Sequence, residues 1–140
     1  MKKNIAFIVI IVFFAAVWHS NKATLIPDSE ISHLIESADL SNAKVAFNQE
    51  CGHCHSLFPK DHGIGPSLSG ILDTEAGQVA GFSAYSKTIN KSQIIWSKYE
   101  LFKFIKSGRS YTSDINMAFE GVTSDQKTAE IVSLLIDKLK

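Results

Sequence analysis

Two cysteines and a histidine stand close together in the stretch Cys51-Gly52-His53-Cys54-His55. Thiols at this spacing lie about one helical turn apart, so both can form thioether bonds to the vinyl groups along one edge of a porphyrin. His55 then follows where its imidazole can reach the iron from that same side. C-x-x-C-H is the attachment signature of a c-type haem. The motif therefore predicts one covalent haem c held through Cys51 and Cys54, with His55 as the first axial ligand.

Two other chemistries also use a C-x-x-C pair, namely a structural zinc site and a thioredoxin-type redox centre. The chain has only two cysteines, so it cannot supply an all-cysteine zinc site. A thioredoxin-type centre needs a strand–helix–strand context, and no such pattern surrounds the motif. The histidine directly after the second cysteine favours haem attachment over both.

Composition and charge narrow the class of protein further. A chain of 140 residues accommodates one domain with short additions. The formal net charge is zero, but the charges are unevenly placed. All 14 acidic residues follow position 24, whereas only 11 of the 14 basic residues do. That part therefore carries a net charge of −3, which argues against a nucleic-acid partner because such binding needs a basic stripe. We expect a monomer.

The start of the chain has the layout of a secretory signal. Lys2 and Lys3 precede 14 apolar residues at positions 5–18. Haem attachment outside the bacterial cytoplasm requires such export. A small-x-small cleavage site is lacking because Trp18 falls within it, which favours an uncleaved signal-anchor helix on the periplasmic side of the inner membrane. A cleaved leader and a soluble periplasmic protein are the alternative, since a span needs about 20 apolar residues.

We expect residues 1–20 to be the signal peptide or signal-anchor, 21–40 a linker and 41–140 the haem domain. Within the linker, apolar residues recur at helical spacing after Pro27. The segment is therefore either a tether or a short helix that packs on the domain surface.

Three helices are expected in the haem domain. The first runs from a Ser41 cap to about position 50, with Ala43 and Phe47 on one face. The second covers residues 98–107, and the last begins at Thr123 or Ser124. The last helix has an apolar stripe and should cross the first one. This stripe comprises Ile131, Leu134, Leu135 and Leu139.

The loop after the motif is rich in glycine and proline. A ligand histidine needs an acceptor for its second ring N–H, and the rigidly placed carbonyl of Pro66 is the best candidate. His62 is expected to make a hydrogen bond between loops, whereas His33 and His53 are expected to be exposed.

Five ordered stretches resemble class I cytochrome c of the mitochondrial and α-proteobacterial type. They are Cys51-Gly52-His53-Cys54-His55, Gly65-Pro66-Ser67-Leu68, Gly77-Gln78-Val79-Ala80-Gly81-Phe82, Ile95-Trp96 and Asn116-Met117-Ala118-Phe119-Glu120-Gly121. The resemblance covers about residues 41–139. It implies an all-α fold whose helices and loops wrap around one covalent haem c.

The resemblance also assigns roles around the haem. Phe82 would pack against the ring, while Tyr85 and Trp96 would donate hydrogen bonds to its propionates. Phe104 stands where the family commonly has a tyrosine that contacts the methionine sulfur. A lone methionine is ordinarily core filling. Because of the family match, and because the only other methionine is Met1, Met117 is predicted as the second axial ligand.

The resemblance implies a one-electron carrier of a respiratory chain rather than an enzyme. Its donor would be a bc1-type complex and its acceptor a terminal oxidase. Lys60, Lys87 and Lys106 are candidates for guiding transient docking. A peroxidase-like haem enzyme or a haem-based sensor is the alternative, and either would need an open distal position on the iron.

Overall fold

The computed structural model describes residues 26–111 and 114–137. The expected leader and Leu139 lie outside this range. The order of elements in the described part is α2 (Asp28–Glu36), α3 (Leu40–Glu50), α4 (Lys87–Lys91), α5 (Lys98–Ser107), η1 (Gly108–Ser110) and α6 (Asp125–Asp137). In the same residues there is no strand, and the only β-bridge joins Glu75 to Ile95. The predicted all-α fold is confirmed.

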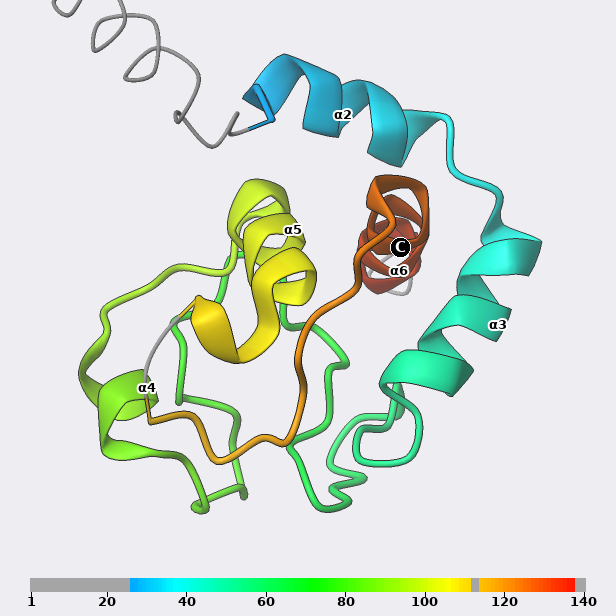
Figure 1. Cartoon of the computed structure of the whole chain (residues 1–140). Helices are drawn as coiled ribbons and strands as arrows, with labels where there is room; N and C mark the ends of the chain where they lie inside the picture. The colour runs from blue at the N-terminus through cyan, green and yellow to red at the C-terminus, as the bar shows by residue number, and fades with distance from the viewer. Residues whose placement is uncertain (1–25, 112–113, 138–140) are drawn as a thin grey trace, which may run out of the picture.

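The crossing of α3 and α6 forms the centre of the fold (Figure 1), where α6 is seen almost end-on between α5, α2 and α3. Ala43 on α3 and Ala129 on α6 are fully buried, and small side chains allow two helix axes to approach closely. Phe47, Ile131 and Leu135 fill the surrounding core. The predicted packing of the last helix on the first is therefore confirmed.

Capping residues set where these helices begin. The predicted Ser41 cap is wrong: α3 begins at Leu40 and its N-cap is Asp39, two residues earlier, whose carboxylate accepts the Ser41 N–H at 2.7 Å. Asp39 competes successfully because a carboxylate next to the positive end of the helix is favoured over a hydroxyl. Ser124 caps α6 by accepting the Lys127 N–H at 3.2 Å, and Ser97 caps α5 by accepting the Glu100 N–H at 3.2 Å.

The segment before α3 contains a helix that packs on the domain. Ile31 and Ile35 on α2 are buried against α6 and α5. The Ser32 hydroxyl lies 3.0 Å from the hydroxyl of Tyr99 on α5. Residues 28–36 therefore form a short helix that packs on the domain, which is the second of the two alternatives left open by the sequence. Among the described residues, no helix is long and apolar enough to cross a membrane.

Long loops below the helices are joined through His62, as predicted. Its Nδ1 accepts the Ser67 N–H at 3.1 Å, and its Nε2 lies 3.1 Å from the Ala80 carbonyl. Because Nδ1 acts as an acceptor, the ring proton is on Nε2 and can be donated to that carbonyl. His62 thus fixes the loop after the C-x-x-C-H motif to the loop that carries Phe82. His33 and His53 are exposed, also as predicted.

Candidate haem site

A largely apolar cavity of about 390 Å³ opens between the helices and the long loops. Its walls come from the end of α3, the loop after it, the inner faces of α5 and α6, and the segment around residue 117. All eight sequence-predicted site residues line this cavity: Cys51, Cys54, His55, Pro66, Phe82, Tyr85, Trp96 and Met117. A concave, mostly apolar space of this size is typical of a site that buries a cofactor.

The two cysteines lie where α3 ends. Cys51 is the C-cap residue of α3, and the Cys54 and His55 N–H groups both donate to its carbonyl, at 3.0 and 2.9 Å. This turn keeps Cys51, Cys54 and His55 at one edge of the cavity. Burial, helped by the charge of Glu50, raises the pKa of the Cys51 thiol to about 12.

The His55 ring is held by two features of the loop. Its Nδ1 lies 2.7 Å from the Pro66 carbonyl, as predicted, so this nitrogen carries the proton and Nε2 keeps the lone pair that a metal needs. The ring also lies directly on Gly65, where a Cβ would come within 2.7 Å of both ring nitrogens. Burial lowers the pKa of His55, and the Pro66 hydrogen bond acts in the opposite direction.

Met117 reaches the cavity from a different part of the chain. It belongs to the segment that returns from η1 to α6, and its side chain is half-buried at the cavity wall. His55 and Met117 are thus brought to one space from positions 62 residues apart in the chain. Both predicted ligands thus line one cavity from separate segments, and their binding to iron stays a prediction.

Aromatic side chains line the same cavity in two edge-to-face pairs. Phe82 and Tyr85 have ring centroids 5.0 Å apart, as do Trp96 and Phe104. Trp96 is buried. The cavity wall is therefore lined with rings that suit an apolar macrocycle. The hydrogen bonds of Tyr85 and Trp96 to propionates stay predictions.

Three contacts near the site were missed by the sequence analysis. Gly65 was quoted only as part of a motif, although its lack of a side chain makes room for His55. Glu50, at the cavity rim, is paired with Lys127 at 3.1 Å. Lys106, considered for partner docking, instead faces Asp125 at 2.6 Å. The two ion pairs join residues far apart in sequence, so no local pattern could reveal them.

Tyr111 stacks edge-to-face on Phe104, with centroids 5.4 Å apart, and donates a hydrogen bond to the Glu100 carboxylate. This bond holds the pKa of Glu100 below its usual range, while burial and then Glu100 raise the pKa of Tyr111. A carboxyl group whose pKa is lower in the folded than in the unfolded protein stabilises the fold at pH values above its unfolded-state pKa. This stabilisation is lost as the pH falls through its folded-state pKa.

We therefore expect Tyr111→Phe to lower the free energy of unfolding by about 1 kcal/mol at neutral pH, since the pair is partly exposed. The difference from the parent protein should shrink as the pH falls below 4.5, the ordinary pKa of Glu100. Denaturant unfolding of both proteins at neutral and acidic pH measures this difference in the free energy of unfolding. A difference that stays constant with pH would contradict this explanation.

The rival interpretations of the C-x-x-C pair find no support in the part of the chain that the structure describes. No group of three or more His, Cys, Asp or Glu residues there is arranged to hold a metal ion. The single isolated bridge provides no sheet for a thioredoxin-type centre.

Comparison with known proteins gives a consistent result, although no family model matches the chain. Cytochrome c of Tetrahymena pyriformis is 31% identical over 101 residues, which cover 72% of this chain and 90% of that protein. Cytochrome c2 of Rhodopila globiformis is 31% identical over 97 residues, which cover 69% and 91%. The chain belongs to the class I cytochrome c family.

A solved structure of the family agrees with this assignment. Cytochrome cH from Methylobacterium extorquens has a TM-score of 0.65 and 26% identity to the chain, covering 71% of this chain and 99% of its own. The chain with Cys51 and Cys54 is therefore a haem-based electron carrier, like these relatives. Its haem c is bound covalently through those two cysteines. The cavity suits that group, because it is apolar, has both cysteines at one edge and contains a histidine whose Nδ1 is engaged by the Pro66 carbonyl, which leaves Nε2 for a metal.

Proposed function

We propose that this cytochrome c is a one-electron carrier of a respiratory chain, with His55 and Met117 as the two axial ligands of the haem iron. The observation that supports this proposal is that both side chains line one apolar cavity that also contains the two cysteines. A carrier needs two protein ligands because a filled coordination sphere changes little when an electron arrives or leaves.

Each residue would have a distinct task. When bound, haem c supplies a ferric/ferrous couple that takes up or releases one electron. His55 would offer Nε2 to the iron while Nδ1 donates to the Pro66 carbonyl, which fixes the ring orientation and increases its basicity. Met117 would offer its thioether, which raises the reduction potential relative to harder ligands. Phe82 and Trp96 would exclude water from the ring faces.

The carrier would work on the periplasmic side of the bacterial inner membrane. We propose residues 1–20 as its signal peptide or signal-anchor, 21–40 as the connecting segment and 41–140 as the haem domain. The basic and apolar pattern at positions 2–18 supports export. Helix α2 lies within the connecting segment. It would hold the second half of that segment against the haem domain.

A bc1-type complex would be the electron donor and a terminal oxidase the acceptor. Lys60 and Lys87 are exposed and remain candidates for guiding either partner, whereas Lys106 faces Asp125. With few such lysines, the interface would be small and transient, and its association rate would fall as salt screens the charges.

Stopped-flow mixing tests this function. We expect the oxidised protein to be reduced by a bc1-type complex supplied with quinol, and the reduced protein to be oxidised by a terminal oxidase. Both rates should fall with rising ionic strength, and Lys60→Gln should lower them further at low salt. Absence of electron transfer with both complexes would overturn the proposal.

The same protein sample separates the carrier from its rivals. A haem enzyme or a gas sensor needs an open position on the iron, so the reduced protein would bind carbon monoxide readily. With Met117 as ligand, the reduced protein should resist carbon monoxide at neutral pH. Rapid binding would favour the enzyme or sensor alternative over the carrier.

A further inference from the structure

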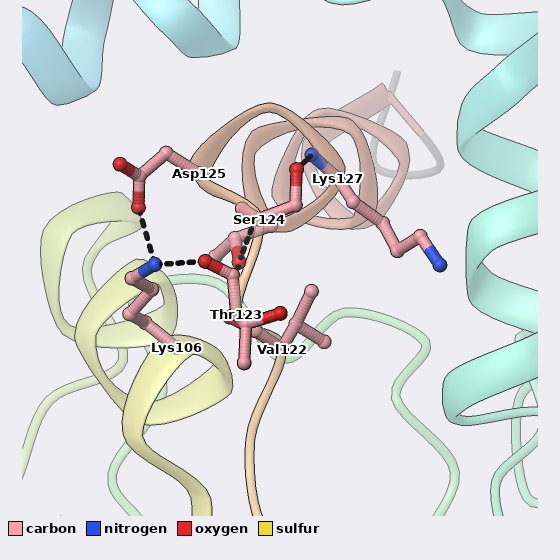
Figure 2. A network of polar contacts seen from close by, with 7 residues as sticks. Lys106, Val122, Thr123, Ser124, Asp125 and Lys127 are labelled. Carbon is pink, nitrogen blue, oxygen red and sulfur yellow. Dashed lines mark hydrogen bonds and ion pairs between the residues drawn. The ribbon is translucent and has the colours of Figure 1, made fainter.

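We propose that Lys106 is a positioning residue that keeps the Met117 segment closed over the cavity; the inference rests on the proposed axial role of Met117. Lys106 lies in the last turn of α5, and its ammonium group contacts two groups at the far end of that segment (Figure 2). They are the Thr123 carbonyl oxygen, to which it donates a hydrogen bond, and the Asp125 carboxylate, at 2.6 Å. We call these two contacts the Lys106 clasp.

The clasp lies at the base of a loop whose two ends meet. The loop leaves α5 at Gly108 and returns at Gly121, and a Cβ on Gly108 would come within 2.5 Å of the Phe119 carbonyl oxygen. Two backbone hydrogen bonds of 2.9 Å cross the base, from Arg109 to Phe119 and from Val122 to Ile105. Met117 lies only two residues before Phe119, whose carbonyl accepts the first of these hydrogen bonds. The base of the loop therefore determines where the Met117 side chain lies.

The side-chain contacts that hold the returning part of the loop differ in how strongly solvent weakens them. The Arg109–Glu120 pair is 3.5 Å apart, and its side chains are 57% and 83% exposed. The Lys106 and Asp125 side chains are 30% and 43% exposed, and the Asp125 oxygen that faces the ammonium group at 2.6 Å is itself buried. Exposed pairs contribute little, whereas a buried carboxylate oxygen that loses its cation is costly.

This arrangement gives the clasp a consequence for ligation. Met117 can leave the iron only if its segment moves away from the cavity, and that movement is easiest when the base opens. Removing the Lys106 cation leaves the Asp125 oxygen facing no charge in the closed form. Solvent reaches that oxygen once the base opens. The open form is therefore favoured, and an external ligand can compete with Met117 more often.

Binding of imidazole to the oxidised, haem-loaded full chain tests this inference. We expect Lys106→Gln to increase the apparent imidazole affinity about five- to tenfold, as expected for losing one partly exposed charged contact. The methionine charge-transfer band should weaken in parallel. Lys106→Arg should restore both values, because a guanidinium can serve the carbonyl and the carboxylate together.

Lys127→Gln provides a matched control. Lys127 pairs with Glu50 at 3.1 Å with similar exposure, but it joins α6 to α3 rather than to the Met117 segment. Both Gln variants should lose similar global stability, while only Lys106→Gln gains imidazole affinity. Equal imidazole affinity in the two variants would overturn the inference. If the parent protein lacks the methionine band, the proposed axial role itself fails, and the two failures are thereby distinguished.

Discussion

Replacing Met117 by leucine is expected to lower the reduction potential by on the order of 0.1–0.3 V, within the range of about 0.8 V that axial ligands span. Leucine has a similar volume and stays apolar, so the cavity wall should remain packed. It offers no lone pair to the iron. The reduced variant should therefore bind carbon monoxide, and the oxidised variant should lose its methionine charge-transfer band. Voltammetry and absorption spectra of the haem-loaded protein measure these changes.

Phe119→Leu serves as the control for that substitution. Phe119 stands two residues away in the same segment and also lines the cavity, but its side chain has no group that can bind a metal. We expect this variant to keep the charge-transfer band and to shift the potential far less. If both variants behaved alike, the effect would arise from packing in this segment, and Met117 would not be the ligand.

Gly65→Ala should disrupt the opposite side of the site. The added Cβ would lie within 2.7 Å of both nitrogens of the His55 ring, so the ring or the loop must shift. Such overpacking typically costs about 1–3 kcal/mol. The shift also pulls the imidazole away from the Pro66 carbonyl. We expect a lower yield of haem-loaded protein and a lower midpoint in denaturant unfolding.

Gly52→Ala is the matched comparison because it lies inside the C-x-x-C-H motif but away from the ring. Its Cβ would lie 3.0 Å from the Asn48 Cα and 3.1 Å from the Asn48 carbonyl oxygen, a tight contact that needs a shift of only a few tenths of an ångström and does not involve the His55 ring. Haem loading and unfolding of this variant should stay near those of the parent. A Gly65→Ala protein that loads haem and unfolds like the parent would show that the ring does not depend on that glycine.

The sequence contains enough local information to predict much of this fold. The α5 helix occupies residues 98–107 as expected, because the apolar period that predicts it is a local signal. The Pro66 carbonyl was found because the chemistry of a ligand histidine demands an acceptor nearby. The cap of α3 was misplaced by two residues because both Asp39 and Ser41 can accept the hydrogen bond, and only the structure decides between them.

Contacts between distant segments could not be predicted in this way. The Lys106 clasp joins residues 17 and 19 positions apart, and the pair of Glu50 and Lys127 spans 77 positions. Single-sequence periodicity carries no record of which charged residues meet across helices. The role of Met117 was likewise available only through the family resemblance, since a lone methionine is ordinarily core filling.

Proton NMR of the reduced protein, labelled with ¹³C on its methionine methyl groups, tests the central claim most directly. The chain has two methionines, Met1 and Met117, so at most two methyl signals are expected. A methyl group bound above the porphyrin face lies in its ring current, and its signal should appear far upfield of the ordinary methionine range. One such signal, lost in Met117→Leu, is the predicted result. Methyl signals confined to the ordinary range would contradict His/Met ligation.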